Sequence, residues 1–379
     1  MSESKEGSGA RLLQLCIGYF GFYTISNVAL KYFINGKLAH HAASVMKENE
    51  FLVYQNIGGS AICLAVIFAL GWYRLQSNGP TRWGPITVPQ EYSYLLPSGV
   101  FTAVVIVTTT LMYELPINPM VAMIIMRGAV IVISRLVDFI QIRQGILKKV
   151  VYWQENVAVL FAIGGVCAKL LGGKKGNEFE FVHSSAAMTI LGSYIAAYSG
   201  RIYIMNYFKN TRAKGVRQDN NGFFGIEQLA ASATMIAAAV FVFYSPSLMG
   251  WHTEKIEEFR GAIITFKPMW GWAVLAGCTY GAVAFFSVFI FIFKGTTATF
   301  AGLVNRLTSL LAGTAATLVI WLALGGDRPA TDDWGAFGLI LIAVAFLTIA
   351  ERRRSAESAA IPGLGGTAGT GVWTGPQKP

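Results

Sequence analysis

The feature that most limits the fold is a series of apolar segments, each about as long as a membrane-crossing helix. Such a helix needs about 20 consecutive apolar residues. The sequence contains segments of this kind at residues 11–33, 52–75, 93–113, 117–140, 153–171, 184–208, 224–246, 269–293, 296–325 and 334–351. We therefore expect an all-α integral membrane protein with ten transmembrane helices.

The small share of charged residues agrees with an integral membrane protein. Charged residues make up 13% of the chain, against about 25% in ordinary soluble domains. So few charges cannot cover the surface of a soluble protein of 379 residues. We therefore expect the lipid bilayer as the main partner and no nucleic acid, although the net charge is +10.

The positions of the basic residues predict how the chain lies in the membrane. Connections on the cytoplasmic side carry an excess of Lys and Arg. If the amino terminus is cytoplasmic, its side receives about twice as many Lys and Arg residues as the other side. Both termini are therefore predicted to be cytoplasmic, and the membrane can be a Golgi or other endomembrane, a plastid membrane or a bacterial inner membrane.

Matching residues in the two halves of the sequence indicate an internal repeat. Arg127 and Arg306 lie at similar depths in the fourth and ninth segments, and Trp153 and Trp334 open the fifth and tenth. Five segments per half force the halves into opposite orientations, and inverted repeats of this kind hold substrates near the bilayer midplane. The predicted organisation is a cytoplasmic tail (1–10), a first five-helix repeat (11–171), a second, inverted one (184–351) and a flexible cytoplasmic tail (352–379).

Arg127 and Arg306 are the strongest candidates for a substrate site. Each lies about ten residues into its segment, near the middle of the hydrocarbon core. A buried guanidinium cannot discharge, and it binds phosphate or carboxylate oxygens with two donors. The alternative is a structural role, in which each arginine bonds helix-end carbonyls or a buried acid.

Lys31 and Arg201 occupy matching places in the first and sixth segments, nearer the segment ends. Their polar neighbours Asn27, Tyr198 and Tyr203 favour a binding site. The positions near segment ends favour side chains that reach the membrane surface. Both interpretations stay open from the sequence.

The sequence resembles a family of transporters. The ten-segment pattern and the ending GTTATFAGLVNRLTSLLAGTAATLVIWLALGGDRPATDDWGAFGLILIAVAFL resemble the drug/metabolite transporter superfamily, and TISNVALKYF and VNRL resemble its nucleotide-sugar and triose-phosphate branch. In that branch an Asn and a following basic residue contact substrate phosphate, which implies this role for Asn305 and Arg306. The resemblance implies a secondary transporter of a small organic anion, such as a nucleotide sugar or sugar phosphate.

No motif for an enzyme, a metal or a cofactor is present in the sequence. Glu155 and Glu227 stand at predicted helix starts, where negative charge is favourable. Without an acid at mid-depth for proton coupling, exchange of one organic anion for another is the expected mechanism. The alternatives are an exporter of amino acids or amphiphilic metabolites, and a non-transporting scaffold subunit.

The motif Gly277-x-x-x-Gly281 permits close packing within the bundle or in a homodimer.

Overall fold

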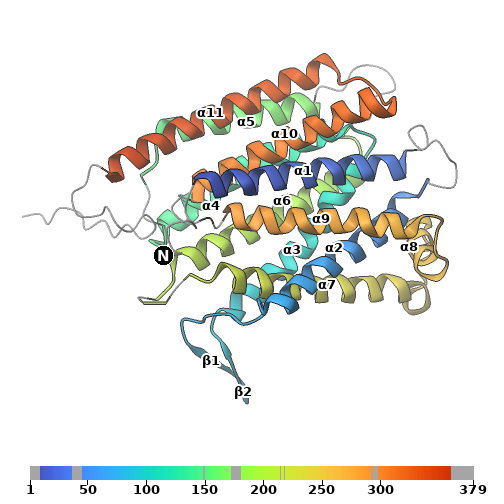
Figure 1. The fold of residues 1–379 in the computed structure, drawn as a ribbon, viewed down its shortest axis with the longest axis horizontal. Helices are drawn as coiled ribbons and strands as arrows, with labels where there is room; N and C mark the ends of the chain where they lie inside the picture. Colours follow the sequence, from blue (N-terminus) through green and yellow to red (C-terminus); the bar gives the residue numbers. More distant parts are fainter. Residues whose placement is uncertain are drawn as a thin grey trace, which may run out of the picture.

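The computed structural model describes residues 9–35, 45–147, 150–171, 181–213, 215–216, 218–291, 293 and 298–359. Most of both predicted tails, residues 1–8 and 360–379, lies outside this range. The described chain is a bundle of helices with one small hairpin (Figure 1). Its elements are α1 (Gly9–Ile34), α2 (Glu48–Leu70), β1 (Pro80–Trp83), β2 (Ile86–Pro89), α3 (Tyr92–Glu114), α4 (Pro119–Arg143), α5 (Trp153–Leu171), α6 (Ser185–Asn210), α7 (Asn220–Met249), α8 (Glu254–Ile264), α9 (Trp270–Phe291), α10 (Ala298–Leu324) and α11 (Thr331–Ala359).

Each of the ten predicted segments coincides with one helix of the described chain, with ends shifted by a few residues. Three elements were not predicted. The short helix α8 lies in the polar stretch 247–268, and the antiparallel strands β1 and β2 lie in the polar stretch 76–92.

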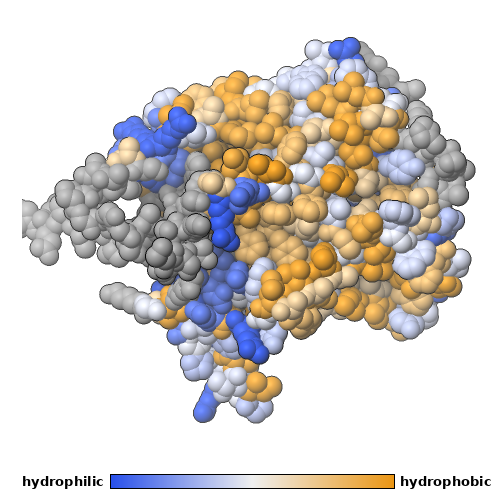
Figure 2. Space-filling model, in the orientation of Figure 1, coloured by the Kyte–Doolittle hydropathy of each residue, from blue (hydrophilic) through white to orange (hydrophobic). Residues whose placement is uncertain are grey.

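Eight helices in the described residues are long and apolar enough to cross a membrane, judged by length and composition: α1, α2, α3, α4, α7, α9, α10 and α11. Helices α5 and α6 are not among them. Apolar side chains cover the middle of the visible face, and hydrophilic ones gather toward one end of it (Figure 2). The chain therefore has the architecture of a helical, multi-pass membrane protein.

The two ends of the bundle carry different elements. Figure 1 shows the start of α1, the hairpin and the end of α11 at one end, which we call the hairpin end. Helix α8 lies at the opposite end, the α8 end. Capping side chains mark where individual helices start. Asn118 caps α4, because its side chain accepts a hydrogen bond from the Val121 amide at 2.8 Å.

The closest packing in the bundle is between α2 and α9. A methyl group added at Gly58 would lie 1.9 Å from the carbonyl oxygen of Val274, and one added at Gly277 would lie 2.3 Å from that of Gln55. One added at Gly281 would lie 2.6 Å from the carbonyl oxygen of Gly59. Glycine is required where two backbones approach this closely. The Gly277-x-x-x-Gly281 motif is thus used within the bundle.

Candidate functional site

Arg127 is held among tyrosine hydroxyl groups. The side chain is 6% exposed, and its Nη2 donates to the hydroxyl oxygens of Tyr23 at 3.1 Å and Tyr19 at 3.4 Å. The guanidinium carbon also lies 5.8 Å from the centroid of the Tyr23 ring, close enough for a cation–π contact. Tyr113 donates to the Tyr23 hydroxyl at 3.1 Å and so fixes that ring from α3.

Local helix geometry puts these groups together. Tyr19 and Tyr23 are four residues apart and therefore share one face of α1. Arg127 lies eight residues beyond Pro119, the first residue of α4, a distance of ~12 Å along the helix. The side chain is thus well inside the bundle, too deep to reach either end.

The guanidinium of Arg127 has no carboxylate partner in the part of the chain that the structure describes, and its buried Nε donates no hydrogen bond there. It borders a cavity of about 80 Å³ whose wall includes five tyrosines: Tyr19, Tyr23, Tyr194, Tyr198 and Tyr280. One water needs ~10–15 Å³, so this Arg127 cavity has room for several. It is an aromatic, mainly apolar chamber with hydroxyl groups and an unneutralised positive charge in its wall.

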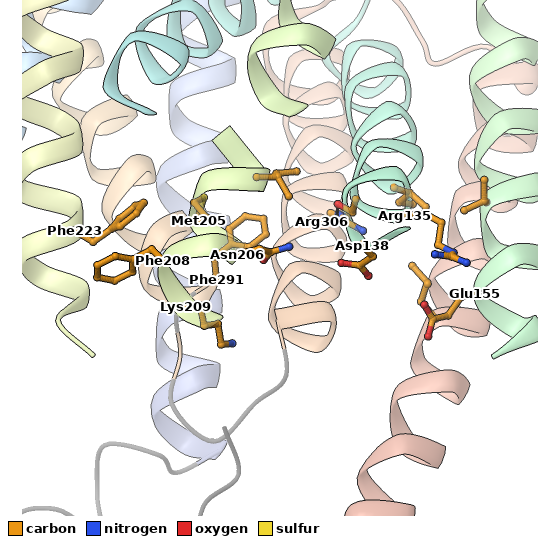
Figure 3. A pocket seen from close by; sticks show the side chains of 15 residues that line it. Arg135, Asp138, Glu155, Met205, Asn206, Phe208, Lys209, Phe223, Phe291 and Arg306 are labelled. Carbon is orange, nitrogen blue, oxygen red and sulfur yellow. Dashed lines mark hydrogen bonds between the residues drawn. The ribbon is translucent and has the colours of Figure 1, made fainter. Parts of the chain in front are cut away.

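Arg306 borders a second cavity, of about 60 Å³. Its side chain is 7% exposed, its Nη2 donates to the hydroxyl of Ser134, and its Nε has no partner among the described residues. Figure 3 shows Arg306 beside Asp138, with Arg135 and Glu155 across the same pocket. This Arg306 cavity lies toward the hairpin end.

Asn305 connects to the Arg127 cavity rather than to the Arg306 cavity. The amide is fully buried, and its Nδ2 donates to the Ser287 hydroxyl at 3.1 Å. Ser287 lines the Arg127 cavity. The buried Oδ1 of Asn305 accepts no hydrogen bond within the described chain.

Arg201 lines the Arg127 cavity but is already paired. Its Nε and Nη2 donate to the two carboxylate oxygens of Glu227 at 3.0 and 2.9 Å. Ser98 donates to the same carboxylate at 2.6 Å, and Glu227 is fully buried. Glu227 was predicted at a helix start, whereas it lies seven residues beyond Asn220, the first residue of α7, and its partner is on α6.

The other predicted site residues lie in several places. Tyr198 is in the wall of the Arg127 cavity. Lys31 donates to the Leu115 carbonyl at 2.9 Å, nearer the α8 end, and lines neither cavity. Asn27 is 2% exposed and also lines neither, and Tyr203 instead donates to Gln144 at 2.8 Å.

The structure therefore groups Arg127, Arg201 and Tyr198 around one cavity, with Asn305 behind it. Arg306 belongs to the neighbouring cavity, so Arg127 and Arg306 do not line one common site in this conformation.

Glu114 is a buried acid that was not predicted from the sequence. This residue is 4% exposed, neither carboxyl oxygen accepts a hydrogen bond from the described residues, and its charge interacts with that of Lys31. The sequence placed it in a turn, so nothing marked it as buried.

Comparison with known proteins adds little to this description. No model of a known protein family matches the sequence, and no curated protein matches it. A solved structure described only as "Crystal structure of protein" aligns with 92% of this chain and 99% of its own, at 15% identity and a TM-score of 0.45. Similarity at this level assigns neither a fold family nor an activity.

Proposed function

We propose that the protein is a secondary transporter of a small organic anion that works by alternating access. In this proposal ten helices form two inverted five-helix repeats, both termini are cytoplasmic, and the substrate binds between the repeats. The observation that carries the proposal is the Arg127 cavity, where a buried guanidinium faces an aromatic chamber without an acid to neutralise it.

The positions of the two arginines agree with an inverted repeat. Arg127 is eight residues from the start of α4, and Arg306 is eight residues from the start of α10. Helix α4 begins near the α8 end, whereas α10 begins near the hairpin end (Figure 1). Each arginine is therefore the same number of residues from the start of its helix, and the two helices start at opposite ends of the bundle. This is the arrangement expected when each of two inverted repeats contributes one binding group.

The chemistry of the chamber selects the class of substrate. An arginine binds carboxylate or phosphate oxygens through charge-assisted hydrogen bonds. Tyrosine rings offer flat apolar surface and their hydroxyls offer further hydrogen bonds, which suits a sugar or a nucleobase attached to the anionic group. Sugar phosphates, nucleotide sugars and related metabolites fit this description.

Anion binding to the purified full-length protein tests the proposal. Glucose 6-phosphate, uridine monophosphate and glucuronate are the probes, and the readouts are thermal stabilisation and exchange across liposomes. A bound ligand stabilises the folded state in proportion to its affinity and concentration. We expect at least one probe to stabilise and exchange, with Arg127→Gln weakening binding by ten- to a hundredfold, since hydrogen bonds to charged groups contribute ~1.5–3 kcal/mol.

Two further variants complete the design. Arg127→Lys keeps the charge and should retain part of the affinity. Arg353→Gln removes a charge from an exposed ion pair with Glu357 and should change nothing. Unchanged anion flux in both Arg127→Gln and Arg306→Gln would exclude these arginines from the substrate site.

A further inference from the structure

The ion pair between Arg201 and Glu227 is the most unusual arrangement in the wall of the Arg127 cavity. The carboxylate is fully buried, and it occupies the Nε–Nη2 edge of a guanidinium that borders the chamber. A second arginine is thus present at the candidate anion site, but Glu227 already fills its Nε–Nη2 edge and neutralises its charge.

An anion in the chamber and the Glu227 carboxylate are chemically alike. Both are acceptors for the two parallel N–H donors of Arg201. An incoming anion can take that edge only when Glu227 leaves it. A buried carboxylate that loses its guanidinium partner keeps one hydrogen bond, from Ser98, and its charge is then left unneutralised in the interior. Protonation removes that charge.

We propose that Glu227 is an internal counter-ion that competes with the anionic substrate for Arg201, and that it takes up one proton when the substrate displaces it. The inference rests on the proposed function and adds a coupling ion to it. One proton passes from solvent to the Glu227 carboxylate, which becomes a neutral carboxyl. One negative charge of the substrate replaces it at Arg201, so the net charge around Arg201 is unchanged.

The groups that face this pair permit such an exchange. The phenols of Tyr198 and Tyr280 interact with Arg201. The other ionisable groups in the same cavity wall are Arg127, Tyr19, Tyr23, Tyr194 and Cys63. No second carboxylate of the described chain forms an ion pair with Arg201. Ser98 adds a hydroxyl that donates to the carboxylate and that can equally accept from the carboxyl, because hydroxyl groups serve in both roles.

This proposal changes the mechanism expected from the sequence. Exchange of anions was favoured there because no acid was found at mid-depth. Glu227 is a fully buried acid within α7, and the predicted start of its segment at residue 224 placed it at a helix end instead. Transport driven by a proton gradient follows directly, since anion and proton bind together.

The test measures binding and proton uptake in nanodiscs that contain the full-length protein. The probes are glucuronate and glucose 6-sulfate, whose charges stay constant near neutral pH. In the wild type we expect the Kd to rise with pH, by up to tenfold per unit, because binding requires a proton. An indicator dye in weakly buffered solution should report up to one proton taken up per anion bound.

The variant Glu227→Gln cannot take up this proton and leaves the binding edge of Arg201 free. Its Kd should no longer depend on pH, its affinity at alkaline pH should exceed that of the wild type, and its proton uptake should be lost. The matched control is Glu50→Gln, which removes another buried acid, paired with Lys267 at 2.8 Å, away from both cavities. The control should behave like the wild type.

The outcomes separate the two proposals. Anion binding by the wild type without proton uptake, at a Kd independent of pH, would overturn the coupling and leave the proposed function intact. Failure of every anion probe to bind the wild type would overturn both. The proton count of the wild type decides the coupling by itself, even if Glu227→Gln proves unstable.

Discussion

Buried charges in this protein fall into two kinds, and the difference is informative at the scale of single residues. Most lie against an opposite charge, as Arg201 does with Glu227 and Lys169 with Asp333 at 2.7 Å. Arg127 has only tyrosines around its charge among the described residues, whereas Arg306 lies beside Asp138. A buried charge is expensive unless it is paired, so an unneutralised one points to a ligand.

The Lys169–Asp333 pair allows a prediction about stability. Asp333 also accepts hydrogen bonds from Asn118 at 2.8 Å and from the Ala330 amide at 3.0 Å. Asp333→Ala leaves a largely buried ammonium without its partner, and we expect a loss of ~3–5 kcal/mol of unfolding free energy. Thermal unfolding in detergent measures it.

The double variant Lys169→Met with Asp333→Leu is the control for that prediction. It removes both charges and should recover most of the loss, because apolar residues of similar volume often replace buried ion pairs without cost. Equal instability of the single and double variants would show that Asp333 acts through Asn118 and Ala330 instead.

Sequence reasoning could identify the depth of a charge but not its partner. The positions of Arg127 and Arg306 within apolar segments predicted their burial. The partner of Glu227 depends on which faces of α6 and α7 meet, and that information is spread over both helices. Glu114 was missed for a related reason, since a residue at the end of a helix is buried only by what packs over it.

At the scale of elements, apolar length predicted the helices well. The ten predicted segments coincide with helices, and eight of these, within the described residues, are long and apolar enough to cross a membrane. Helix α8 and the hairpin were missed because their signals are local. They depend on a cap at Thr253 and on a four-residue strand pairing, both within polar stretches.

The contact between α2 and α9 gives a prediction at this scale. Gly58→Ala places a methyl group against the backbone of α9, and the two helices must move apart. Overpacking of this kind costs ~1–3 kcal/mol, which a lower unfolding temperature should show.

The control is Gly192→Ala on α6, where an added methyl group meets nothing within 4 Å. This variant should be neutral or slightly stabilising, because alanine favours helix more than glycine does. A similar loss of stability in both variants would contradict the importance of the contact.

At the scale of the whole molecule, the two predicted halves are interleaved. Helix α2 packs on α9, α5 on α11, and α3 on α6 and α7, so most major contacts join one half to the other. Sequence comparison of the halves could suggest a duplication, but it could not show which faces meet. The Arg127 cavity lies among helices of both halves for this reason.

The proposed orientation predicts which side of the membrane each end faces. Thr87 in the hairpin and Glu254 in α8 are exposed at opposite ends. A membrane-impermeant maleimide should label Thr87→Cys only from the cytoplasmic side and Glu254→Cys only from the other side, in vesicles of known sidedness. Labelling of both from one side would contradict the orientation.

The unneutralised charge of Arg127 has a consequence for how the proposed transporter responds to membrane voltage. Moving one elementary charge across the full membrane potential changes the free energy by ~2.3 kcal/mol per 100 mV. The Arg127 cavity carries such a charge when it is empty, and it carries the same charge after one monoanion and one proton have entered together. Voltage should therefore act equally on the return of the empty carrier and on the passage of the loaded one.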